Sequence, residues 1–186
     1  LFTTPNIENF ISGVILFEET LKQSSNGKRL SKVLEEKNII PGIKVDKGIC
    51  PCPGYEEFSY TQGFDGLRQR CEEYYGLGAK FAKWRAVVNI INNQTPEMVI
   101  KANAQALALY ASTAQSSNLV PIVEPEVLMD GDHSINICRK ITEKTLEIVF
   151  SELENFNVNL KEIVLKPNMI LPGSNSNETE IPQKLL

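Results

Sequence analysis

Histidine is nearly absent from this sequence, and cysteine is scarce. The only histidine among the 186 residues is His133, and a single imidazole argues against a catalytic metal site built on histidine. We therefore expect no metal and no cofactor. The four cysteines, Cys50, Cys52, Cys71 and Cys138, lack the CxxC spacing of metal and redox motifs, so we predict reduced thiols of an intracellular protein.

Long apolar runs and an excess of positive charge are missing as well. No apolar run approaches the ~18 residues of a membrane helix, and the N-terminus lacks the pattern of a secretory signal. Lys plus Arg number 19 against 23 for Asp plus Glu, a net charge of −4, which argues against nucleic acid or a membrane as partner. We expect a cytoplasmic protein whose residues 1–186 form a single domain, with a loop or frayed tail over residues 172–186.

Short apolar runs rich in Val, Ile or aromatic residues recur along the chain and are predicted as buried strands. They are Ile11–Phe17, Gly42–Val45, Ala79–Trp84, Leu119–Val123 and Glu162–Leu165. The gaps between them carry helical patterns over 62–75, from Thr95-Pro96-Glu97 to about Ser116, and from a predicted cap at Asp132 to about Val149. This alternation predicts an α/β fold with a parallel sheet. No GxGxxG or GxxxxGK[ST] motif follows a strand, which disfavours the nucleotide-binding folds.

Ionisable residues interrupt or follow each predicted strand from the second onward. They are Lys44 and Asp46, Lys83 and Arg85, Glu124 and Glu126, and Lys166. Residues two apart on a strand point to the same side, and in a parallel α/β barrel the strand ends meet at one rim. A charge after a strand is usually a solvated loop residue, but charges beside apolar runs are costly unless paired. We therefore predict a site with four cations and three carboxylates.

Lysine chemistry is the most specific activity that such a site suggests. A lysine close to other cations in a dry pocket has a lowered pKa, so its amine can attack a carbonyl and form a Schiff base. A neighbouring carboxylate can move the protons as the carbinolamine loses water. The surplus of Lys and Arg suits an anionic substrate, most simply a phosphorylated sugar.

Six stretches of the sequence resemble class I fructose-bisphosphate aldolase. They are GVILFEETL (13–21), PGIKVDKG (41–48), TQGFDGLRQRCEEYYGLGAKFAKWR (61–85), ANAQALALYAS (102–112), LVPIVEPEVLMDGDHS (119–134) and LKPNM (165–169). The segments ISGVILFEETL and NIIPGIKVDKG are most similar in sequence to the aldolases of apicomplexan parasites. The resemblance implies an (α/β)8 TIM barrel, of which this chain would cover about five βα units, the second to sixth strands. The first strand would precede Leu1, and the seventh and eighth would follow Leu186.

The resemblance also implies a function. Class I aldolases are lyases of glycolysis that reversibly cleave fructose 1,6-bisphosphate to dihydroxyacetone phosphate and glyceraldehyde 3-phosphate, and they are homotetramers. Lys166 in LKPNM matches the lysine that forms the Schiff base. Glu124 in VEPE matches the general acid/base that acts on the carbinolamine, and Lys83 in KWR matches the cation that stabilises developing charge.

Four further residues match supporting positions of the aldolase site. Glu126 matches the second acid, which helps to position the lysines, and Asp46 matches an acid that pairs with the active-site cations. Lys44 and Arg85 match groups near the distal phosphate of the substrate. Each of these roles is what the resemblance implies.

Two other functions remain open from the sequence. One is a different barrel enzyme that forms a Schiff base, such as a transaldolase-like or deoxyribose-phosphate-aldolase-like protein, although these proteins lack the KWR and VEPE motifs. The other is a non-catalytic scaffold that binds actin or acidic adhesin tails through Lys44, Lys83 and Arg85. Outside the site, we predict that His133 is a surface or capping residue and that Trp84 packs outward against the helices.

Overall fold

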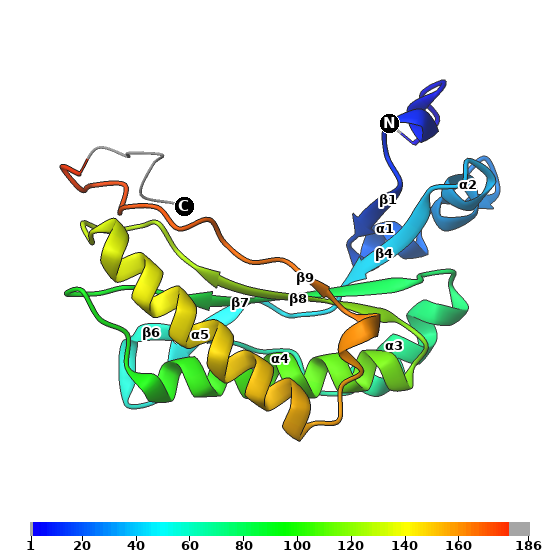
Figure 1. Ribbon diagram of the computed structural model, residues 1–186. Helices are drawn as coiled ribbons and strands as arrows, with labels where there is room; N and C mark the ends of the chain where they lie inside the picture. The colour runs from blue at the N-terminus through cyan, green and yellow to red at the C-terminus, as the bar shows by residue number, and fades with distance from the viewer. Residues whose placement is uncertain (1, 179–186) are drawn as a thin grey trace.

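A parallel five-stranded sheet organises the protein (Figure 1). The computed structural model describes residues 2–178. In spatial order the strands are β1 (Gly13–Leu16), β4 (Ile40–Lys44), β7 (Phe81–Val88), β8 (Val120–Val127) and β9 (Val164–Leu165). Every neighbouring pair is parallel, and the spatial order follows the chain order, as in a barrel rather than in a doubly wound sheet. The five predicted strands and their parallel arrangement are confirmed.

Helices connect the strands, and the longest two cover one face of the sheet. The helices are α1 (Glu18–Lys22), α2 (Leu30–Glu36), α3 (Leu67–Gly76), α4 (Glu97–Ser116) and α5 (Ile135–Asn155), with short 3-10 turns η1 (Ile7–Asn9) and η2 (Leu160–Glu162). Helix α4 packs against β7 and β8, and α5 packs against α4 and β8. Both lie on the same side of the sheet in Figure 1. No helix within residues 2–178 is long and apolar enough to cross a membrane.

An aromatic stack joins the covered face of the sheet to its helices. Trp84 on β7 is fully buried and lies between Phe64, at a ring distance of 4.7 Å, and Tyr110 of α4, at 5.5 Å. The phenol of Tyr110 donates to the carbonyl of Ile122 at 3.3 Å, and burial raises the pKa of this phenol. Trp84 therefore packs outward against the helices as predicted, and the residues that alternate with it, Lys83 and Arg85, face the other side of the sheet.

The predicted helix starts are wrong in detail. The Thr95 hydroxyl donates to the Asn89 carbonyl at 2.6 Å instead of capping, and α4 begins at Glu97 after Pro96 without a side-chain cap. Ser134, not Asp132, caps α5, because its hydroxyl accepts from the amide of Ile137. The helix predicted over 62–75 starts only at Leu67, since Gly63 and Gly66 have φ angles of 133° and 62°.

Two antiparallel hairpins were not predicted. One pairs β2 (Ser24–Ser25) with β3 (Lys28–Arg29), and the other pairs β5 (Ile49–Cys52) with β6 (Tyr55–Thr61). The second hairpin contains two of the four cysteines. All four thiols are free.

The segment after β9 is ordered by contacts with the β8–α5 loop. The amides of Gly173, Ser174 and Asn175 donate to the carbonyls of His133, Met129 and Gly131 at 2.7–2.8 Å. The loop predicted for 172–186 is thus irregular but held in place over 172–178, and residues 179–186 lie outside the described residues.

The loop residue His133 is itself buried. It is 1% exposed, and neither ring nitrogen has a hydrogen-bond partner among residues 2–178. The prediction of a surface or capping residue is therefore wrong. Burial lowers the pKa of the imidazole, against a smaller opposing effect of Asp132.

Candidate active site

Strand register gathers the predicted site residues on the open face of the sheet. Lys44 of β4 pairs in register with Lys83 of β7, and Arg85 of β7 pairs with Glu124 of β8. The amide of Lys166 donates to the carbonyl of Val123 at 2.9 Å, which places Lys166 beside Glu124. All seven predicted residues therefore lie on, or directly after, four neighbouring strands on the open face of the sheet, and the same-face pairs are confirmed.

A buried carboxylate between two lysines is the centre of this group. Glu124 is 3% exposed, and its Oε1 accepts a hydrogen bond from Nζ of Lys166. Nζ of Lys83 lies 2.5 Å from Oε2 as an ion pair outside hydrogen-bond geometry. The Lys83 side chain is 14% exposed and that of Lys166 is 58% exposed. Two amines of different accessibility thus share one desolvated carboxylate.

Two further ion pairs flank this centre. Asp46 is buried, and its Oδ1 pairs with Nζ of Lys44 and accepts from the amide of Gly48 at 3.2 Å. Its Oδ2 accepts from the amide of Arg85 at 3.4 Å. The Arg85 guanidinium pairs with Glu126, and this hydrogen bond raises the pKa of Arg85. With four cations and three carboxylates, the site keeps one net positive charge.

Three residues without a predicted role form hydrogen bonds to the backbone at or next to the site residues. The Thr61 hydroxyl donates to the carbonyl of Arg85 at 2.7 Å. Arg70 of α3 donates to the carbonyl of Val45 at 2.9 Å and also to that of Gly63. Asn168 accepts from the amide of Val127 at 3.1 Å. All three stand inside stretches that resemble aldolase, Thr61 and Arg70 in 61–85 and Asn168 in LKPNM. Their roles could not be predicted from the residue types, because their partners are backbone groups.

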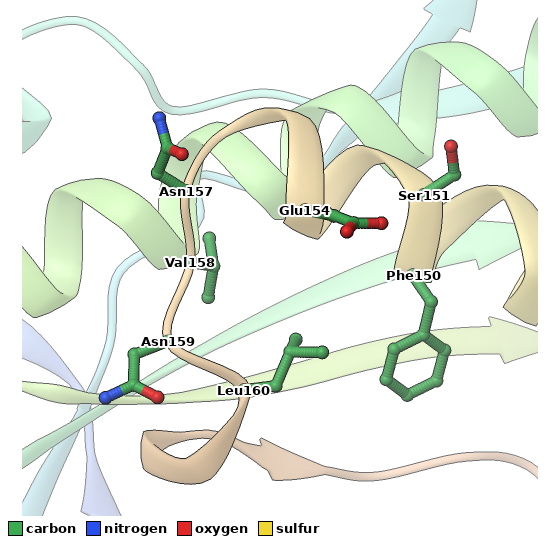
Figure 2. A pocket seen from close by; sticks show the side chains of 7 residues that line it. All are labelled: Phe150, Ser151, Glu154, Asn157, Val158, Asn159 and Leu160. Carbon is green, nitrogen blue, oxygen red and sulfur yellow. The ribbon is translucent and has the colours of Figure 1, made fainter.

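Within residues 2–178, the site coincides neither with a metal cluster nor with the hollow at the end of α5. Residues 2–178 contain no group of three or more His, Cys, Asp or Glu side chains placed to hold a metal ion. A hollow of about 730 Å³ lies at the end of α5, as Figure 2 shows. It is lined by Phe150, Ser151, Glu154, Asn157, Val158, Asn159 and Leu160. Glu154 is its one ionisable residue, so it offers no comparable chemistry.

The sequence model of the class-I fructose-bisphosphate aldolases, a glycolytic family, matches residues 1–185 of the chain. This chain belongs to that family. It is 51% identical over 177 residues to the cytoplasmic isozyme 1 of fructose-bisphosphate aldolase from Pisum sativum, covering 95% of this chain and 50% of the relative. It is 50% identical over 179 residues to a probable class 1 aldolase from Xylella fastidiosa, covering 96% and 54%.

A solved aldolase has the same fold. It comes from Plasmodium falciparum and was crystallised in complex with TRAP and a small-molecule inhibitor. The TM-score is 0.94 at 47% identity, over 100% of this chain and 54% of that chain. The five-stranded sheet is thus the aldolase α/β fold over this region, and the expected fold class is confirmed. The chain spans about half the length of the curated relatives it matches.

Proposed function

We propose that the protein is a class I fructose-bisphosphate aldolase of cytoplasmic glycolysis. It would reversibly cleave fructose 1,6-bisphosphate to dihydroxyacetone phosphate and glyceraldehyde 3-phosphate. The observation that carries this proposal is the buried carboxylate of Glu124 between the amines of Lys83 and Lys166. Membership of the aldolase family supports it.

Lys166 is the proposed nucleophile because its amine is the more accessible of the two. Glu124 first takes a proton from the Lys166 ammonium with which it is paired, and the free amine adds to the substrate ketone and forms a carbinolamine. Glu124 then returns this proton to the carbinolamine hydroxyl, which leaves as water. Glu124, ionised again, removes the proton of the C4 hydroxyl. The C3–C4 bond then breaks, C4 becomes the aldehyde carbon, and the bonding electrons move toward the iminium nitrogen to give an enamine on Lys166. Lys83, on the other oxygen of Glu124, offers a fixed positive charge where negative charge develops on the substrate.

The flanking pairs suit the anionic ends of a bisphosphorylated sugar. Lys44 and Arg85 are each held by a carboxylate, Asp46 and Glu126, which fixes their direction. We assign Lys44 and Arg85 to a substrate phosphate, and the two acids to keeping these cations in position. The net positive charge favours a phosphate over a neutral sugar.

Borohydride trapping with dihydroxyacetone phosphate tests the mechanism. We expect one stable adduct, mapped by peptide mass spectrometry to Lys166 and lost in Lys166→Met. Lys161→Met is the matched control, because Lys161 is a nearby lysine at the exposed turn η2. It should form the adduct as the wild type does. No adduct on a folded wild-type chain, or an adduct elsewhere, would overturn the proposal.

A second candidate function is the binding of an acidic peptide at the same cations. The support is that the related Plasmodium falciparum aldolase was crystallised with TRAP. Because Lys44, Lys83 and Arg85 would serve both ligands, fructose 1,6-bisphosphate should displace a bound acidic peptide. Peptide binding that survives saturating sugar phosphate would place the peptide elsewhere.

A further inference from the structure

The hydrogen-bond ladder between β8 and β9 stops at the reactive lysine. The amide of Lys166 donates to Val123 of β8. Alternate residues of a strand direct their backbone groups to the same neighbour, so Pro125 and Val127 also face the β9 side. Proline has no N–H, which removes the donor that Pro125 would contribute toward β9. Immediately after Lys166 the backbone therefore loses its regular attachment to β8.

The side chain of Asn168 replaces that attachment. Its Oδ1 accepts from the amide of Val127, the last residue of β8, at 3.1 Å. Its Nδ2 donates to the Thr142 hydroxyl of α5 at 3.2 Å and to the carbonyl of Met169 at 3.0 Å. Thr142 is 3% exposed, so its hydroxyl is a fixed acceptor. Asn168 thus ties the loop that follows Lys166 to a strand, to a helix and to the loop itself.

The backbone on either side of Lys166 limits where its amine can lie. The Lys166 side chain is 58% exposed, and an ion pair of an exposed, flexible lysine is weak by itself. Its contact with Glu124 therefore depends on a backbone held on both sides of Lys166. One attachment is the hydrogen bond from the amide of Lys166 to Val123. The other is the hydrogen bond that Asn168, two residues later, accepts from the amide of Val127.

We propose that Asn168 is a positioning residue, which holds the backbone after Lys166 on β8 and so keeps the Lys166 amine at Glu124. The proposal rests on the proposed function, in which Lys166 is the nucleophile. Asn168 does not face the substrate in this role and acts only through Lys166. Its loss changes the formation of the Schiff base more than the affinity for the substrate.

Replacing Asn168 by leucine, which has a similar size and no hydrogen bonds, is the principal test. With Asn168→Leu, the trapping rate at saturating dihydroxyacetone phosphate should fall by about tenfold or more, because small displacements of a reacting group have large effects on rate. The half-saturating concentration should change by less than about twofold. Asn168→Asp keeps an acceptor for Val127 and should retain more of the rate. Thr142→Val removes only the bond to α5 and should have the smallest effect.

Competitive acetylation with acetic anhydride gives an independent measurement without substrate. Lys101 of α4 is the internal reference, because it is also ion-paired and its side chain is 49% exposed. In Asn168→Leu the acetylation of Lys166 relative to Lys101 should rise severalfold, while the other lysines keep their wild-type ratios. A general loss of folding would instead raise all ratios and lower the thermal midpoint.

The outcomes separate this proposal from the function on which it rests. An unchanged acetylation ratio and an unchanged trapping rate in Asn168→Leu would overturn the role of Asn168. If Asn168→Leu does not fold, the same two measurements on Asn168→Ala decide, because alanine also lacks the acceptor for the amide of Val127, and wild-type values in Asn168→Ala would overturn the role of Asn168. If the wild-type chain forms no adduct at all, the proposed function fails, and the acetylation ratio still tests the positioning.

Discussion

At the scale of single residues, Glu124 is the centre of the site, because its two carboxylate oxygens are shared between the amines of Lys83 and Lys166. From the sequence, the alternation of side chains along a strand predicts that Lys83 shares a face with Arg85 and that Glu124 shares a face with Glu126. It does not say that Lys83 and Lys166 both contact Glu124, because this depends on the register between three strands. The burial of His133 could not be predicted from the local sequence either, because the backbone of its loop is bound by a segment about forty positions later, in which the amide of Gly173 donates to the carbonyl of His133.

The two glutamates of the site should differ in their contribution to stability. Glu124→Gln leaves the Lys83 ammonium buried beside Lys166 without a counter-charge, and we expect a loss of about 2 kcal/mol in the free energy of unfolding. Glu126→Gln breaks a pair whose side chains are 28% and 43% exposed, so it should cost less than about 1 kcal/mol. Urea denaturation measures both values. Equal losses would contradict the central position of Glu124.

The pH dependence of stability should contain a contribution from His133. Burial lowers the pKa of the folded imidazole below its unfolded value of 6.5, so the unfolded chain binds the proton more readily. Its contribution is complete above about pH 6.5 and is lost as the pH falls toward the folded pKa. The wild type should lose more stability between about pH 7.5 and about pH 5.5 than His133→Leu, as urea midpoints would show. Identical losses in both proteins would refute this.

At the scale of elements, apolar runs identified the five strands because a buried strand needs a continuous apolar segment. The ends of the helices were less predictable. Thr95 and Asp132 are suitable capping residues, yet Thr95 bonds to the preceding loop and Ser134 occupies the cap of α5. A cap depends on the path of the incoming chain, which local sequence leaves undetermined.

The segment after β9 depends on a glycine at a close backbone contact. A Cβ atom on Gly173 would lie 2.3 Å from the carbonyl oxygen of Gly131, so Gly173→Ala should destabilise the protein by about 1–3 kcal/mol. Gly76→Ala is the matched control, since Gly76 ends α3 with open space around it. This change should be neutral or stabilise by up to about 1 kcal/mol. The thermal midpoints of both variants measure this difference, and an unchanged midpoint in Gly173→Ala would contradict the close contact.

At the scale of the whole molecule, the open face of the sheet has a charged half and an apolar half. The charged half is the site near the carboxyl ends of the strands. Toward the amino ends, an apolar hollow of about 340 Å³ is lined by Ile40, Lys80, Phe81, Val120, Ile122 and Val164. Ile40, Val120 and Val164 are 40–49% exposed. The sequence indicated apolar strands here but not that one of their faces would lie open.

This apolar half should make the chain associate with itself. A contiguous apolar surface of this kind is usually covered in solution, so light scattering should give a mass above the 20.8 kDa of one chain. Val120→Lys, which puts a charge on the lining of the hollow, should shift the mass toward that of the monomer. A monomeric wild-type chain would contradict the expectation. The homotetramer implied by the family resemblance is one assembly compatible with it.

The position of Trp84 gives the protein a built-in optical probe. It is the only tryptophan of the chain, it is enclosed between Phe64 and Tyr110, and its two neighbours in sequence are the site residues Lys83 and Arg85. Its fluorescence spectrum therefore reports on one strand, without the overlapping signals that several tryptophans would produce. Emission at short wavelength would indicate that this strand is packed on its helices, and a shift to the red would register its exposure to water. The state of the site strand can thus be followed in solution without any added label.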